Sequence, residues 1–161
     1  MIFALNIKVQ GVQEINHRFR KVVYGVSDNK PWLERLAKQS IYPLTQKAFS
    51  KQGMPKWAKL KRGYSIWKAR NYPGKGILEL SGGLRKSLTS RTGAGSIYDL
   101  RKDSLTIGSK LQVGKWNLGL LHQMGTKKMA QRTIYSNEML RRIDKDMLKF
   151  GQEHLKHAIR D

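Results

Sequence analysis

The chain has 161 residues, with 32 lysines and arginines against 11 aspartates and glutamates, a net charge of +21, and no cysteine. Its length favours one globular domain over residues 1–161, and the lack of cysteine excludes a disulfide scaffold, a cysteine nucleophile and a zinc finger. With 39% hydrophobic residues, among them four Trp, six Tyr and four Phe, we expect a folded core and not a disordered polycation. Because no apolar run reaches the roughly 18 to 20 residues that span a bilayer, we expect a soluble protein without a membrane partner.

The N-terminal third predicts one strand and two helices. Residues 2–9 alternate between apolar and polar side chains, which is typical of a strand with one buried face. Apolar residues then recur at helical spacing over residues 12–23 and again over residues 31–49. Pro31 suits the first turn of the second helix, whereas Pro43 inside it should kink that helix or split it in two.

The composition changes over residues 51–76, where glycines and prolines interrupt a basic, aromatic stretch. We expect a long ordered loop here, with a short helix over residues 64–70. A loop of this length inside a compact domain usually serves a function or contacts a partner.

The remainder predicts three short strands and two helices. Residues 84–91, 96–100 and 104–107 are typical of an antiparallel meander, with turns after residues 91 and 100. Residues 115–124 predict a helical turn or two that Gly125 ends, and Ser136 can cap a final helix with an apolar stripe. The predicted fold class is therefore α+β, with an antiparallel meander and an N-terminal strand packed against two N-terminal helices and a C-terminal helix.

The positive charge is concentrated within the predicted domain. Residues 35–78 contain eleven basic and no acidic side chains, and residues 104–137 contain five basic and none acidic. The final predicted helix is nearly neutral, so the excess charge does not belong to a basic tail.

Residues typical of catalysis are sparse. Glu79 is the only acidic residue between Arg35 and Thr92, and we expect it to be exposed or to form a salt bridge. His154 and His157 share a helix face that a metal could bridge, but without a visible third ligand we expect a polar face. We therefore predict no catalytic residues, no metal, no cofactor and no enzymatic activity.

The basic loop offers candidate contacts to an anionic partner. Its lysines and arginines alternate with Trp57, Tyr64, Trp67 and Tyr72, as in proteins that bind single-stranded nucleic acid. The aromatic residues could equally anchor the loop to a neighbouring surface while the lysines meet an acidic protein. The candidate contact residues are Lys56, Lys59, Lys61, Arg62, Lys68, Arg70 and Lys75.

Three segments together resemble the phage virion morphogenesis proteins, which include tail-completion and neck proteins of Mu-like tailed phages. Residues 49–60 are similar to that family's F-x-x-x-G-x-P-x-W-x-x-L element, and residues 78–87 to its L-x-x-T/S-G-x-L-R-x-S element. Residues 122–126 are similar to H-Q-x-G-T, and residues 129–133 to M-P-x-R-P, with Ala130 and Thr133 in place of the two prolines. The matching residues taken as structural or interface candidates are Gly53, Pro55, Trp57, Leu60, Gly82, Leu84, Arg85, Ser87, His122, Gln123, Gly125 and Arg132.

The resemblance implies a structural virion protein located at the head–tail junction, and in the host cytoplasm during assembly. Such proteins form cyclic homo-oligomers around the DNA path, here expected to be six- or twelve-fold, and contact neck, connector or tail-terminator proteins. The packaged DNA would be contacted without sequence specificity. Two alternatives remain: the motif residues could simply maintain the fold, and the protein could be a free nucleic-acid-binding protein without sequence specificity.

Overall fold

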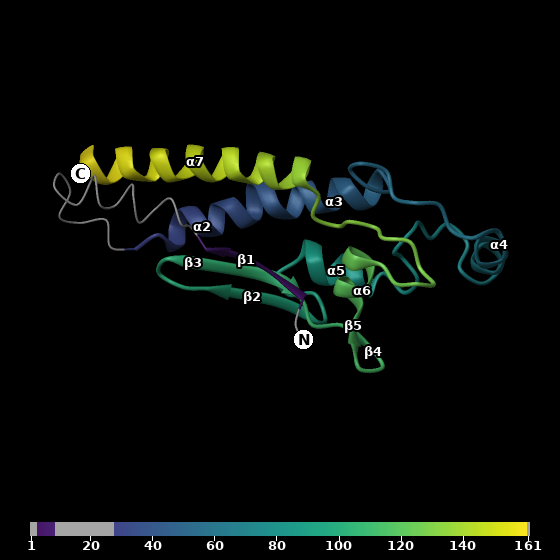
Figure 1. Ribbon diagram of the computed structural model, residues 1–161. Helices are drawn as coiled ribbons and strands as arrows, with labels where there is room; N and C mark the ends of the chain where they lie inside the picture. Colours follow the sequence, from purple (N-terminus) through teal and green to yellow (C-terminus); the bar gives the residue numbers. More distant parts are fainter. Residues whose placement is uncertain (1–2, 9–27, 161) are drawn as a thin grey trace.

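The computed structural model describes residues 3–8 and 28–160, and its elements form the predicted α+β fold (Figure 1). A three-stranded antiparallel sheet lies on one side of a helix made of α2 (Lys30–Leu36) and α3 (Tyr42–Ser50), and the long helix α7 (Asn137–Arg160) lies on the other side. The predicted helix over residues 12–23 lies outside the described residues. No helix in the described part of the chain is both long and apolar enough to cross a membrane.

The sheet has the order β1-β3-β2, with β1 (Phe3–Lys8) and β2 (Ser96–Leu100) on the two edges of β3 (Ser104–Ser109). Both pairings are antiparallel, so that Ser109 lies opposite Phe3 on one side and Ser96 on the other. All three strands were predicted. The prediction of a first meander strand over residues 84–91 is wrong, because residues 84–89 belong to the helix α5 (Gly83–Thr89).

The helix α5 follows from a burial pattern that repeats every three to four residues. Leu84, Ser87 and Leu88 are buried, while Lys86 between them is exposed. This spacing places the three buried side chains on one helical face, which packs against α3 and β3. Because Leu84 and Leu88 are separated by four residues, they are also compatible with the alternation of a strand.

The predicted disruption near Pro43 takes the form of a π-helical segment, η1 (Ala37–Ile41), between α2 and α3. The N–H of Tyr42 donates to the carbonyl of Ala37, five residues back. Proline lacks an N–H and its ring collides with the carbonyl four residues earlier, so the wider turn before Pro43 lets the helical path continue.

The helix α7 runs antiparallel to α2 and α3 and closes the core. Arg35 pairs with Glu153 at 2.6 Å, and Ser40 donates to the carboxylate of Asp146 at 2.6 Å. The predicted cap at Ser136 is confirmed, since its Oγ accepts a hydrogen bond from the N–H of Met139 at 3.3 Å. The apolar side chains between these helices and β3 that are almost completely buried include Leu33, Leu36, Ile41, Phe49, Leu105, Ile107, Met139 and Ile143.

Two small elements complete the side of the molecule next to α5. A hairpin of β4 (Gln112–Val113) and β5 (Trp116–Asn117) leads into α6 (Leu118–Met124), and Gly125 with φ of 71° ends this helix as predicted. The side chain of Asn117 caps α6 by accepting from the N–H of Leu120 at 3.0 Å, and it also donates to the carbonyl of Ser109 at 2.8 Å. These bonds fix α6 to the end of the sheet.

Candidate functional site

Residues 51–76, here called the basic arm, leave the body after α3 and return just before residue 77. The helix α4 (Arg62–Asn71), which matches the predicted short helix, lies at the far end of the arm, away from the sheet (Figure 1). Gln52 joins the two ends of the arm, because its amide donates to the carbonyl of Phe49 at 2.8 Å and accepts from the N–H of Ile77. The arm is therefore a long loop whose two ends are held together by Gln52 where it meets the body. The role of Gln52 has no signal in the sequence.

Trp57 fastens the arm to the body and is part of the core. Its ring is buried and meets Phe49 edge-on, with ring centroids 5.3 Å apart and planes at 79°. Its indole N–H donates to the carbonyl of Thr133 at 2.8 Å. Trp57 is consequently unavailable for stacking with a partner, unlike the other aromatic residues of the arm.

Those other aromatic residues form a cluster on α4 and its C-terminal end. Tyr64 and Trp67 stack with ring centroids 5.4 Å apart, and Tyr72 contacts Trp67 at 5.6 Å. Tyr64 and Trp67 remain 46% and 44% exposed. A partly exposed aromatic cluster among cations can bind a partner through stacking as well as charge.

The cations of the arm fall into two groups. Six of the seven candidate contacts are exposed, namely Lys56, Lys59, Lys61, Arg62, Arg70 and Lys75. Lys68 differs, because it is only 4% exposed and its ammonium donates to the carbonyl of Gly76. Burial lowers the pKa of Lys68. Lys68 is therefore not part of the exposed surface of the arm, and its side chain holds the returning segment of the arm in place.

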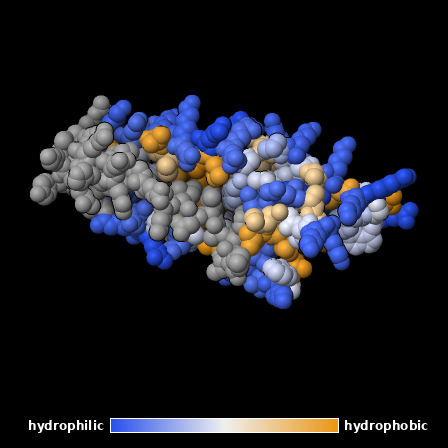
Figure 2. Space-filling model, in the orientation of Figure 1, coloured by the Kyte–Doolittle hydropathy of each residue, from blue (hydrophilic) through white to orange (hydrophobic). Residues whose placement is uncertain are grey.

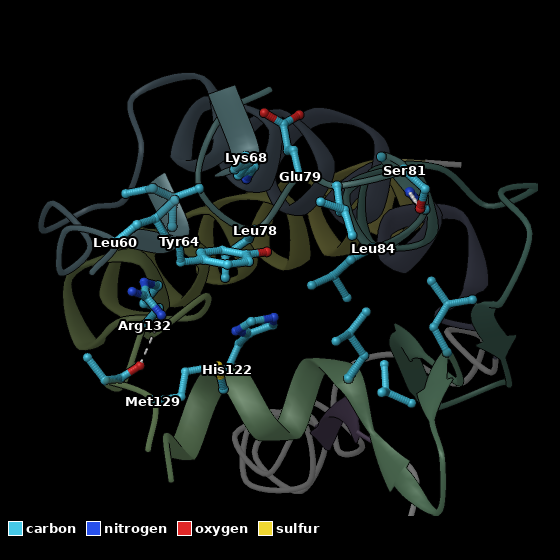
Figure 3. A pocket seen from close by; sticks show the side chains of 18 of the residues that line it. Leu60, Tyr64, Lys68, Leu78, Glu79, Ser81, Leu84, His122, Met129 and Arg132 are labelled. Atoms are coloured by element: carbon cyan, nitrogen blue, oxygen red, sulfur yellow. Dashed lines mark hydrogen bonds between the residues drawn. The ribbon is translucent and has the colours of Figure 1, made fainter. Parts of the chain in front are cut away.

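The three segments that resemble the phage family meet around one pocket of about 640 Å³ at the root of the arm. Leu60 comes from the first segment, residues 78–84 from the second, and His122, Met129 and Arg132 from the third. Figure 3 shows Tyr64, Leu78, His122 and Arg132 around the hollow. Most of the pocket wall is apolar. The sequence gives no direct signal of this pocket, because its walls come from residues that lie far apart in the chain.

Arg132 links the third segment to the first. Its guanidinium donates to the carbonyls of Ala58 at 2.9 Å, Lys59 at 3.2 Å and Ala130 at 3.3 Å, and its backbone N–H donates to the carbonyl of His122 at 2.8 Å. The side chain is 5% exposed, and burial lowers its pKa. The planar guanidinium presents five donors that point in different directions, so it can reach carbonyls that lie apart, whereas the donors of a lysine all lie on one compact ammonium.

His122 lies in the pocket wall on α6. Burial, together with the nearby charges of Arg132 and Lys68, lowers its pKa to about 4, so the ring is neutral at pH 7. Its Nδ1 is buried and has no hydrogen-bond partner among the described residues. Among the described residues that line the pocket, Glu79 alone carries a carboxylate, and it pairs with Arg85 at 2.8 Å.

Several other motif residues make bonds within the chain. The side-chain amide of Gln123 accepts from the N–H groups of Ile134 at 2.8 Å and Tyr135 at 3.3 Å, and Ser87 donates to Ser109 at 2.8 Å. These contacts hold α6 against the segment before α7, and α5 against β3.

The glycines of the motifs occupy positions with positive φ, which other residues rarely adopt. A Cβ on Gly53 or Gly125 would also lie within 3 Å of neighbouring backbone, whereas Gly82 has open space around it. Pro55 follows a cis peptide bond and is exposed.

His154 and His157 lie on α7, and no group of three or more His, Asp or Glu side chains in residues 3–8 and 28–160 could hold a metal ion. The chain matches no protein-family model, and no curated protein or solved structure matches it.

Proposed function

We propose that this protein is a structural subunit of a ring at the head–tail junction of a tailed phage, with the role of a neck or tail-completion protein. The observation that carries the proposal is the convergence of the three motif-like segments, residues 49–60, 78–87 and 122–132, on one pocket at the root of the basic arm. Coincidental short matches would have no reason to meet in space. The shared location supports their interpretation as parts of one family-like unit.

The basic arm suits contact with DNA or with an acidic neighbour in such a ring. Its exposed cations lie on a segment that extends from the body away from the sheet (Figure 1) and that Gln52 and Trp57 fasten at its root. Contacts from lysine and arginine to phosphate carry no sequence information, so DNA could pass them without being held at one site. In a cyclic assembly, every copy would present its arm at the same distance from the axis.

The pocket supports binding more than acid–base catalysis. Acid–base catalysis usually needs two titratable groups that are both free to exchange protons with a substrate. Here the carboxylate of Glu79 is held in an ion pair with Arg85. Burial first, and then the neighbouring cations Arg132 and Lys68, lower the pKa of His122 and keep its ring neutral. This environment suits recognition of a partner, as expected of a structural subunit.

A second candidate is a free nucleic-acid-binding protein, and the aromatic cluster of α4 favours it. Tyr64 and Trp67 are exposed next to Arg62 and Arg70, a combination that can stack on bases and neutralise phosphates. In that case the protein would act in solution, without a ring.

Phage assembly tests the first proposal. Deleting the coding sequence from the phage genome should leave full heads and complete tails that do not join, and wild-type protein supplied in trans should restore infectious particles. In those particles the protein should form a closed ring. Normal particles without the protein, or single copies in place of a ring, would contradict the proposal.

Binding in solution separates the two candidates. The arm variant replaces Lys56, Lys59, Lys61 and Arg62 by glutamine, and the control variant replaces the equally exposed Arg141, Lys145, Lys149 and Lys156 of α7. If the arm contacts phosphates, the arm variant should reduce the slope of log affinity against log salt for a DNA duplex by about 3, and the control should hardly change it. Tight binding to single-stranded DNA, with normal particle assembly after deletion, would favour the free nucleic-acid-binding protein.

A further inference from the structure

The pocket at the root of the arm contains two buried cations that are not neutralised. Lys68 and Arg132 are 4% and 5% exposed, and within the part of the chain that the structure describes neither forms an ion pair. Their hydrogen bonds go to backbone carbonyls only. Buried charges are normally paired because desolvation is costly, so an anion in the pocket would relieve this cost.

Glu79 does not supply the missing charge. It lies close enough to Lys68 to act on it electrostatically, but its carboxylate binds Arg85 at 2.8 Å. Glu79 thus acts on Lys68 while it is paired with Arg85, and no ion pair of the described residues neutralises Arg132. A net positive charge remains at this end of the pocket.

Both buried cations have hydrogen-bond donors to spare. A guanidinium carries five N–H donors, and Arg132 uses three of them in the bonds to Ala58, Lys59 and Ala130. An ammonium carries three donors, and Lys68 uses one on Gly76. The unused donors can bind the oxygens of a carboxylate with charge-assisted hydrogen bonds.

The rest of the pocket fits an apolar group attached to that anion. Leu60, Leu78, Leu84, Leu118 and Met129 line it, and Figure 3 shows Leu78 and Leu84 across the hollow from His122, with Leu60 and Met129 on the side of Arg132. At the mouth, Leu80 is 39% and Val113 is 57% exposed. In Figure 2, hydrophobic surface near α6 and the β4–β5 hairpin lies beside hydrophilic side chains of the arm.

We propose that this pocket binds an acidic peptide segment of a partner protein, with a carboxylate on Lys68 and Arg132 and a neighbouring apolar side chain against the leucine wall. The exposed Lys59, Lys61 and Lys128 line the same pocket and would attract further acidic residues of the segment. A volume of about 640 Å³ accommodates a few side chains but no nucleic-acid duplex. Of the described residues that line the pocket, only Tyr64 and His122 carry an aromatic ring, so most of the wall offers aliphatic side chains and not a platform for stacked bases.

This inference adds a partner to the proposed function, but its test uses the isolated full-length chain and does not depend on ring formation. The probe is a fluorescein-labelled octapeptide in which aspartate and glutamate alternate with leucine and phenylalanine. Three comparison probes keep only one property each: the same peptide with amides in place of the acids, the same acids with glycine in place of the apolar residues, and an oligothymidylate of equal charge. Fluorescence anisotropy gives the affinity of each.

We expect the acidic, apolar probe to bind about tenfold or more tightly than each comparison probe. Lys68→Met should weaken its binding about tenfold or more, whereas Lys149→Met, which removes an exposed charge from α7, should change it less than about twofold. Val113→Glu is a second variant whose position is exposed, so that it keeps the fold while placing a carboxylate at the mouth. It should also weaken binding clearly.

Three results would overturn the proposal. The acids alone could bind as tightly as the complete probe, which would indicate diffuse attraction to a basic surface. Lys149→Met could weaken binding as much as Lys68→Met, or the oligothymidylate could bind most tightly and displace the peptide. Failure of the acidic, apolar probe to show saturable binding to correctly folded wild-type protein would equally refute it.

Discussion

Replacing Arg132 by lysine tests whether a guanidinium holds the arm to the body. The substitution keeps the positive charge but replaces a planar group with several donors by a compact ammonium. Arg132 bonds the carbonyls of Ala58, Lys59 and Ala130, which belong to the first and third motif-like segments. A lysine at this position can reach one of these carbonyls well, so at least two of the three bonds should be lost.

The cost follows from the number of lost bonds and from their surroundings. Hydrogen bonds to charged groups contribute about 1.5–3 kcal/mol each, and neutral ones about 0.5–1.5 kcal/mol. Ala58, Lys59 and Ala130 are exposed residues, so water can replace part of each lost bond. With two bonds lost at the lower end of the charged range, the free energy of unfolding should fall by about 2–3 kcal/mol.

Urea denaturation monitored by tryptophan fluorescence measures this change. With an m-value of about 2 kcal/mol per molar, the midpoint should fall by roughly 1 M while the m-value stays constant. Arg142→Lys is the matched control, because Arg142 makes one exposed contact to Glu138 at 2.7 Å and its replacement should cost less than about 0.5 kcal/mol. If both variants lose equally little stability, the guanidinium does not hold the root of the arm.

Two further predictions test the turn glycines and the neutral histidine. Gly82→Ala should cost about 1–2 kcal/mol, because its φ of 80° disfavours any Cβ but the space around it is open. Gly125→Ala should cost clearly more, because its Cβ would also lie 2.8 Å from the backbone nitrogen of Gln131; equal losses in denaturation would contradict this difference. Since the pKa of His122 is lowered to about 4, the unfolded chain binds the proton more readily, and stability should fall as the pH is lowered from 6.5 to 4. Because the ring is partly exposed, the free energy of unfolding of the wild type should fall by about 1–2 kcal/mol more than that of His122→Gln between pH 7 and 4. If the stabilities of the two proteins fall in parallel with pH, the neutral state of His122 does not contribute to stability.

Much of the fold follows from local periodicity in the sequence. The alternation over residues 2–9 corresponds to β1, and the residues predicted as strands over 96–100 and 104–107 lie in β2 and β3. The helical stripe after Ser136 corresponds to α7. Each of these patterns depends on residues that are close together in the chain, which is why these elements can be predicted from the sequence alone.

The error over residues 84–91 shows where local periodicity fails. Leu84 and Leu88 are four residues apart, which satisfies the two-residue repeat of a strand as well as the 3.6-residue repeat of a helix. The burial of Ser87, whose Oγ bonds Ser109 on β3, and the exposure of Lys86 separate the two possibilities. A buried serine gives no signal in a hydrophobic pattern.

Several residues of the candidate site could be named from the sequence, but their arrangement could not. Lys68 and Arg70 have the same neighbourhood in the sequence, yet one is buried against Gly76 and the other is exposed. Trp57 resembles Trp67 in the sequence but packs on Phe49 in the core. These differences arise from contacts between segments far apart in the chain, which composition and spacing do not record.

The arm and the body both contribute residues to the pocket, so a ligand bound in the pocket would affect the position of the arm. Leu60, Tyr64 and Lys68 belong to the arm, whereas Leu84 and His122 belong to the body, so a bound peptide would touch both at once. A ligand that binds only the docked arrangement stabilises it by an amount that grows with ligand concentration. Binding of an acidic segment would therefore restrict the arm against the body and fix the direction in which its exposed cations point. In an assembly, the direction of the arm's exposed cations would then depend on whether the acidic segment is bound in the pocket. Binding in the pocket would in this way affect how the arm contacts a second partner.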